Sequence, residues 1–279
     1  MLHLLRTEFY RHPRRMTVLV SFAVLFVMGA VNIFGFFSSM RQSQEFYYKH
    51  HLEMGITELA YRSEMDYNWH LRFSELFSNY AHMIIFSLLM VTLPLSFDLM
   101  AQRNDELTAA GYSPGRIFAA KTLAAIPTAL GCYLFVLAVN FFTPYRLIAG
   151  LISGKEWLVM LKIAAVSASQ FVCFCLVGAG VAFFVRRPLV SFFVNFGLGI
   201  VLRPHIILRH WFADQQFYRF FDSLDGNAMI SLFGQDPGFP DCWADGGRYL
   251  VAATLLLLAI GLLIWTAGLI ANNIREKRR

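Results

Sequence analysis

Long apolar runs alternate with polar segments along most of the chain, and their lengths predict membrane-spanning helices. A helix needs about 20 predominantly apolar residues to cross the hydrocarbon core of a bilayer. Five runs approach or exceed this length: Met16–Phe37, Ala81–Phe97, Phe118–Phe142, Trp157–Val185 and Tyr249–Ala271. The pattern therefore predicts a polytopic membrane protein built from helices. In the fourth run, the small residues Gly178, Ala179, Gly180 and Ala182 predict a close contact with another helix.

A sixth apolar run, Leu189–Leu202, is shorter than the others. As a helix it would cover about 21 Å, less than the hydrocarbon core of about 30 Å. Arg203 and Pro204 interrupt it, and an aromatic, arginine-containing segment and a Gly/Pro-rich loop follow. We interpret residues 203–247 as an outer re-entrant segment and loop that precede the last span. The expected fold class is thus all-α, with six transmembrane helices of which the fifth is broken.

Two polar segments flank the first span. In residues 1–15, Leu2, Leu5 and Phe9 share one helical face, which predicts an interfacial elbow helix lying on the membrane surface. This segment lacks the small-residue cleavage site of a secretory signal. Residues 38–80 contain acidic and basic side chains, a single glycine and no proline, so an external helical insert is expected there. The whole chain, 1–279, is expected to form a single transmembrane domain.

Composition and charge agree with a membrane protein. Hydrophobic residues make up 57% of the chain and charged residues 15%, and the mean hydropathy is +0.52. If both termini are cytoplasmic, short inner segments hold more than half of the 24 basic residues, as the positive-inside rule requires. The net charge of +6 is therefore interpreted as a topology signal and not as a nucleic-acid footprint. We expect a multi-pass protein of the cell membrane with both termini in the cytoplasm.

The polar stretch 98–117 separates the second and third spans. Its periodicity indicates a short amphipathic helix followed by Gly111 as a C-terminal cap, and then by Ser113 and Pro114, which suit the start of the next helix. A plain loop is equally compatible with the periodicity. The residues at helical spacing are Leu99, Arg103, Glu106, Leu107 and Ala110.

This stretch resembles the coupling-helix region of ABC-2 type permeases, the transmembrane subunits of ATP-driven exporters. The similar features are charged residues before Glu106-Leu107, then Ala110-Gly111-Tyr112-Ser113, Arg116-Ile117 and Lys121. The basic N-terminal helix and the broken element before the last span are also similar to that family. The resemblance implies a cytoplasmic coupling helix that docks on an ATP-binding subunit. The implied docking and corner residues are Arg103, Glu106, Leu107, Ala110, Gly111 and Ser113.

The resemblance also implies partners and an activity. The chain would pair with a second permease chain, identical or paralogous, and with ABC ATP-binding subunits that hold the ATP and magnesium. The pair would export a hydrophobic or amphipathic cargo such as a peptide, drug or lipid. The chain itself would bind no cofactor and would not be an enzyme.

The sequence contains no motif for ATP binding or hydrolytic chemistry. Gly154-Lys155 is followed by Glu156 and lacks the rest of a Walker A loop. Asp98 lies at the inner boundary of the second span, and the other predicted spans contain no Asp or Glu, which disfavours ion-coupled transport. The four cysteines suggest neither a disulfide framework nor a metal site. The alternative is a membrane-embedded enzyme or sensor subunit acting at the outer lipid interface through His205, Arg209, His210 and Asp214.

Overall fold

The computed structural model describes residues 2–54, 80–100, 103–148, 154–201 and 248–277, and all the elements in these ranges are helical. This result confirms the all-α class for the described part of the chain. In order, the elements are α1 (Leu2–Arg11), the 3-10 turn η1 (His12–Arg14), α2 (Met16–Met54), α4 (Tyr80–Ser87), the π-helical turn η2 (Leu88–Thr92), α5 (Leu93–Met100), α6 (Arg103–Ala109), α7 (Pro114–Ile148), α8 (Gly154–Val185), α9 (Pro188–Val201) and α13 (Arg248–Lys277).

Five described segments are long and apolar enough to cross a membrane, which supports the prediction of a polytopic membrane protein. They are Met16–Gly35, Met83–Met100, Pro114–Val136, Ala168–Val185 and Thr254–Arg275. α9 contributes a shorter apolar segment, Pro188–Gly199, as expected for the interrupted run. The predicted outer segment 203–247 lies outside the described residues, so the re-entrant segment and the total of six spans with a broken fifth span remain predictions.

Several helices continue beyond the boundaries that hydropathy predicted. The first span was expected to end at Phe37, yet α2 continues as one helix to Met54. The loop expected over Thr143–Glu156 is also partly helical, because α7 ends at Ile148 and α8 begins at Gly154. Hydropathy marks where a helix leaves the bilayer, whereas only a cap or a breaker ends its hydrogen bonding. The remainder of the 38–80 insert, residues 55–79, lies outside the described residues.

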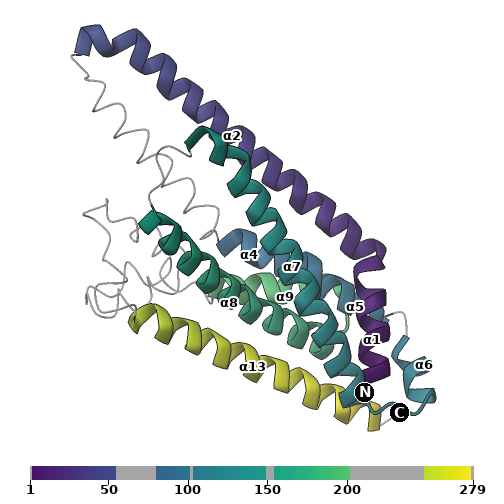
Figure 1. Cartoon of the computed structure of the whole chain (residues 1–279). Helices are drawn as coiled ribbons and strands as arrows, with labels where there is room; N and C mark the ends of the chain where they lie inside the picture. Colours follow the sequence, from purple (N-terminus) through teal and green to yellow (C-terminus); the bar gives the residue numbers. More distant parts are fainter. Residues whose placement is uncertain (1, 55–79, 101–102, 149–153, 202–247, 278–279) are drawn as a thin grey trace.

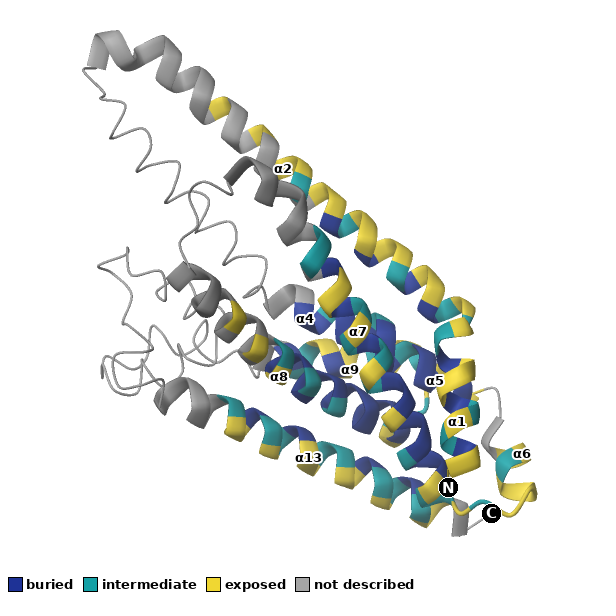
Figure 2. Ribbon diagram, viewed as in Figure 1, coloured by how far each residue is buried: buried dark blue, intermediate teal, exposed yellow. Residues whose placement is uncertain are grey.

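α8 and the α4–η2–α5 segment form the centre of the bundle, and α2 and α13 lie at its outside (Figure 1). Buried residues concentrate on the central elements, while the outer faces of α2 and α13 are exposed (Figure 2). The centre contains an aromatic cluster in which Tyr133 stacks on Phe171 at 4.4 Å between ring centroids and Phe86 meets Tyr133 edge-on at 5.4 Å. The exposed outer faces carry apolar side chains, as expected of surfaces that contact lipid.

Glycines allow α8 and α13 to approach each other very closely. A Cβ placed on Gly180 of α8 would lie 2.5 Å from the carbonyl oxygen of Ile264, and one on Gly268 of α13 would lie 2.6 Å from the carbonyl oxygen of Gly180. Both distances are far below van der Waals contact. Small residues are expected where membrane helices pack backbone to backbone, and the structure confirms that the small-residue segment of the fourth span makes such a contact.

The second span contains a π-helical turn that the hydrophobic pattern did not predict. The N–H of Leu93 donates to the carbonyl of Leu88, five residues earlier, and Pro94 has no N–H with which to continue this register to Leu89. The hydroxyl of Ser21 on α2 lies 2.9 Å from the Leu89 carbonyl oxygen and 2.6 Å from Thr17 O, so its single proton is shared between these two acceptors. The proline thus frees a carbonyl inside the bundle, and α2 supplies a hydroxyl that can donate to it.

The polar residue Asn195 in α9 also serves helix packing. Its Nδ2 donates to Thr92 Oγ1 at 2.8 Å, and both groups are buried. A Cβ on Gly178 would lie 2.4 Å from that same Thr92 oxygen. The glycine therefore leaves the space in which α9 and the π-helical turn are joined by this hydrogen bond.

Candidate functional site

The predicted coupling stretch forms a short helix, a tight corner and a second helix. Gly111 has φ +85°, a backbone conformation that glycine adopts without steric cost. The N–H of Gly111 donates to Thr108 O at 2.9 Å and the N–H of Tyr112 donates to Leu107 O at 3.1 Å, the two bonds of a Schellman cap. The carbonyl of Ser113 then accepts from Arg116 and Ile117 at the start of α7. The structure confirms a short helix over Arg103–Ala109, its glycine cap and the corner, whereas Leu99, which was predicted to share that helix, is buried in α5 at the end of the second span.

α6 is attached to the bundle through two apolar side chains. Leu107 and Tyr112 pack against a cluster formed by Leu4 of α1 and by Ile117 and Ala120 of α7. These two residues flank the Schellman cap, where a hydrophobic contact commonly accompanies the hydrogen bonds. Through this contact, the α6 corner is packed against both α1 and α7.

The structure separates the six residues implied by the family resemblance into different environments. Glu106, Ala110, Gly111 and Ser113 are exposed, and Leu107 is half-buried. Arg103 begins α6, and its side chain lies outside the described part of the structure. Glu106 is thus available to a partner, whereas part of Leu107 faces the protein. Their docking role stays a prediction.

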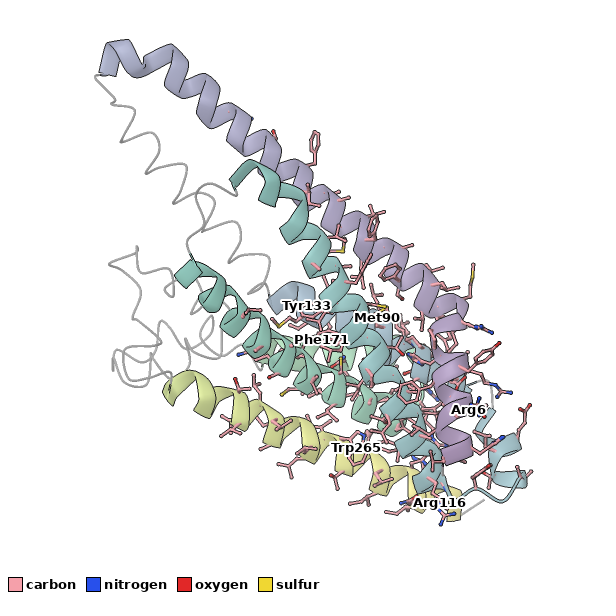
Figure 3. The ribbon with its side chains drawn as sticks, in the orientation of Figure 1. Arg6, Met90, Arg116, Tyr133, Phe171 and Trp265 are labelled. Atoms are coloured by element: carbon pink, nitrogen blue, oxygen red, sulfur yellow. The ribbon has the colours of Figure 1, made fainter. Side chains whose placement is uncertain are left out.

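α6 lies at the end of the bundle where α1 begins and α13 ends (Figure 1). The corner between α8 and α9 belongs to the same end, because Arg186 donates to Asn272 of α13 and Arg275 donates to Phe184 O at 2.7 Å. Figure 3 shows Arg6 and Arg116 at this end, with Tyr133 and Phe171 farther into the bundle.

A buried ionic cluster joins three elements beside α6. Asp98 Oδ2 of α5 accepts from Lys121 of α7 and from Arg15 Nη2 at 3.1 Å, and the same Arg15 nitrogen lies 3.0 Å from Glu8 Oε2 of α1. Only 1% of the Lys121 side chain, 2% of Asp98 and 3% of Glu8 are exposed. Two positive and two negative charges balance within the cluster, as buried ions require.

His12 lies next to this cluster and is also buried. Its Nδ1 lies 3.3 Å from Arg15 Nη1. Burial, and then the positive charge of Arg15, lower the pKa of His12 from 6.5 to about 4, although Asp98 acts in the opposite direction. At neutral pH His12 is therefore uncharged, and protonating it would add a third positive charge beside Arg15 and Lys121.

We expect this histidine to make stability depend on pH between about 6.5 and 4. Below pH 6.5 the unfolded chain binds a proton that the folded chain does not, so the stability present above 6.5 is lost as the pH falls. The lowering of the His12 pKa from 6.5 to about 4 corresponds to a loss of about 3 kcal/mol in the free energy of unfolding at low pH. The measurement is the thermal unfolding midpoint of the purified protein across this range.

In that measurement His12→Gln should flatten the pH dependence. His3→Gln, which changes an exposed histidine of the neighbouring helix α1, should leave the pH dependence as in the wild type. Parallel curves for the wild type and His12→Gln would show that His12 does not carry the effect.

A cavity of about 750 Å³ opens beside the ionic cluster, between α1, α2, α5, α6 and α7. We call it the elbow groove. Its floor consists of buried or half-buried residues: Glu8, Arg15, Thr17, Pro94, Asp98, Leu107 and Lys121. Its mouth consists of exposed residues: Tyr10, Arg11, Arg14, Met16, Phe97, Met100 and Glu106. The groove therefore connects the predicted docking residue Glu106 with the ionic cluster.

The ionic cluster was not predicted from the sequence. The hydrophobic pattern predicted an outward apolar face for α1, and Leu2 and Phe9 are indeed exposed, at 85% and 40%. It did not reveal the adjoining face, on which Leu4 and Glu8 are buried. The sequence does contain a signal for part of this cluster. Asp98 and Lys121 carry opposite charges at the same predicted end of neighbouring spans, where an ion pair can form.

The described residues provide no evident catalytic or metal centre. They contain no group of three or more His, Cys, Asp or Glu side chains that could hold a metal ion. Cys132, Cys173 and Cys175 are free thiols. His205, Arg209, His210 and Asp214, which were considered for an interfacial reaction, lie outside the described residues.

The chain matches no protein-family model, no curated protein and no solved structure. Its function is therefore inferred from the sequence pattern and from the geometry of the helices at the end of the bundle that carries α6.

Proposed function

We propose that this chain is the transmembrane permease subunit of an ATP-driven exporter of the ABC-2 type, with α6 as its coupling helix. The observation that carries the proposal is the position of α6. It is an exposed short helix, fixed by the Gly111 cap, at the end of the bundle where basic residues gather. By the positive-inside rule this end is cytoplasmic, where an ATPase can reach it.

The contacts of α6 support a mechanical role. Leu107 and Tyr112 contact α1 and α7, and α5 and α7 are linked through Asp98 and Lys121. Movement of a docked ATPase would displace α6 and, through these contacts, the ends of α1, α5 and α7. We propose that this displacement opens a path for a hydrophobic or amphipathic cargo at the interface with a second permease chain.

The proposal requires an ATP-binding partner, because the sequence lacks a Walker A loop. The ATP and magnesium would be bound by that partner. The cell membrane, with both termini on the cytoplasmic side, is the location that the charge distribution favours.

We expect Glu106→Lys to release the ATPase and uncouple its activity from transport. The exposed Glu106 side chain would exchange a negative for a positive charge within the predicted contact, and like charges facing each other weaken association. The measurement is affinity purification from native membranes in a mild detergent, followed by identification of any co-eluting protein with Walker motifs.

The matched control is Arg187→Glu, a charge reversal of equal size at an exposed residue of the α8–α9 corner. It should retain the ATPase. If no ATPase co-elutes with the wild type, or if Glu106→Lys retains it as well as Arg187→Glu does, the coupling assignment of α6 is wrong.

A further inference from the structure

The elbow groove has two chemically distinct parts. Among the described residues, the floor carries equal numbers of positive and negative charges, Arg15 and Lys121 against Glu8 and Asp98. The described part of the mouth carries Arg11 and Arg14, for which no ion pair is found there, and one acidic side chain, Glu106. The excess positive charge therefore lies at the mouth, in exposed side chains that can reach an anion.

Apolar side chains line the same mouth. Met16 is 74% exposed, Phe97 42% and Met100 59%. Met16 begins the first apolar segment, and Phe97 and Met100 belong to the end of the second. If these two segments cross a bilayer, the three side chains would lie where the hydrocarbon core meets the headgroup region. Arg14 is fixed there by Tyr10, since its guanidinium lies 3.6 Å from the centre of the Tyr10 ring.

From this arrangement we infer that the elbow groove binds a phospholipid with an anionic headgroup. The phosphate would lie between Arg11 and Arg14, and an acyl chain would follow Met16, Phe97 and Met100 into the bilayer. A small soluble anion would contact only the arginines of the mouth. A phospholipid would contact these arginines with its phosphate and the apolar side chains of the mouth with an acyl chain. Basic pockets between membrane helices on the cytoplasmic side suit anionic headgroups in this way.

The bound lipid would contact α1, α2, α5 and α6 together, since residues from all four line the groove. It would therefore influence the position of α6 relative to the spans. This inference does not depend on the identity of the proposed exporter, because it requires only the groove and a bilayer.

The test is lipid binding to the purified full chain in a nonionic detergent, measured by native mass spectrometry. Dioleoyl phosphatidylglycerol is the probe, and dioleoyl phosphatidylcholine is its zwitterionic counterpart. We expect phosphatidylglycerol to bind about tenfold more tightly. Arg11→Gln with Arg14→Gln should weaken its binding by roughly ten- to thirtyfold and leave phosphatidylcholine binding unchanged.

The matched control is Arg116→Gln with Arg187→Gln, which removes two exposed arginines at the same end of the bundle but outside the groove. It should retain the preference for phosphatidylglycerol. Glu106→Gln gives an independent check, because removing the acidic side chain of the mouth should tighten phosphatidylglycerol binding several-fold. If both double variants lose phosphatidylglycerol binding equally, the lipid is attracted by the general positive charge of the surface, and the proposed lipid site is wrong.

Two further outcomes would also overturn it. If inorganic phosphate alone displaces phosphatidylglycerol at comparable concentration, the groove is a site for a free anion. If the Arg11/Arg14 double variant retains phosphatidylglycerol but loses a co-purifying protein, the groove is a protein-docking surface. Failure to find an ATPase partner would leave the lipid measurement unaffected, so the two proposals fail separately.

Discussion

Replacing Gly180 with valine should lower the free energy of unfolding by about 3 kcal/mol, the upper range for overpacking a close contact. A Cβ at this position would lie 2.5 Å from Ile264 O and 2.9 Å from the Cα of Trp265. The atoms in the way belong to the backbone of α13, so no side-chain rotation can relieve the overlap. The helices must separate, which also loosens the contact of Trp265 with Phe118 at 4.9 Å between ring centroids.

The measurement is the thermal unfolding midpoint of the purified protein in detergent, with Gly131→Val as the control. Gly131 lies in the membrane-spanning part of α7 and is exposed, and a Cβ added to it would meet no atom within 4 Å. Its substitution should change the unfolding free energy by about 0.5 kcal/mol or less. Equal midpoints for the two variants would contradict a backbone-to-backbone contact between α8 and α13 at Gly180.

Asp98→Asn should destabilise the protein by about 3–5 kcal/mol, the range expected when one partner of a buried ion pair is removed. The substitution keeps the shape of the side chain and removes its charge. Arg15 and Lys121 would then share a single carboxylate, Glu8, and Lys121 is almost completely buried. The result would be an uncompensated positive charge at the end of the third span.

A compensating variant distinguishes charge balance from a general packing defect. Adding Lys121→Met to Asp98→Asn removes the uncompensated positive charge and shortens the unbranched side chain by only one atom, so it should restore most of the lost stability. Asp105→Asn, the same change at an exposed residue of α6, should stay within about 0.5 kcal/mol of the wild type. If Asp98→Asn is as mild as Asp105→Asn, the cluster does not stabilise the fold.

The sequence predicted those features that depend on composition or on one special residue. Apolar length predicted the spans, Gly111 predicted the cap after α6, and the small residues near Gly180 predicted a close helix contact. Each of these follows from local physics: transfer of apolar side chains into lipid, a positive φ, or the absence of a Cβ.

Features that depend on the rotation or register of a helix were not predictable in this way. Glu8 is buried because α1 turns that face toward Arg15, and only the assembled bundle determines this rotation. The π-helical register at Leu88–Thr92 leaves no trace in the hydrophobic pattern, since Pro94 indicates only a missing N–H. The candidate site was therefore predicted for α6 and its corner, but not for the groove beside them.

The length of α2 has a geometric consequence. At 1.5 Å per residue its 39 residues extend over about 58 Å, roughly twice the thickness of the hydrocarbon core. An uninterrupted helix of this kind is a lever that begins beside Arg15 at the ionic cluster, and about half of its length, Met16–Gly35, is apolar enough to lie in the bilayer. A rotation of about 10° at Met16 would sweep Met54 through about 10 Å. Small rearrangements at the charged end of the bundle would thus become large displacements on the far side of the membrane.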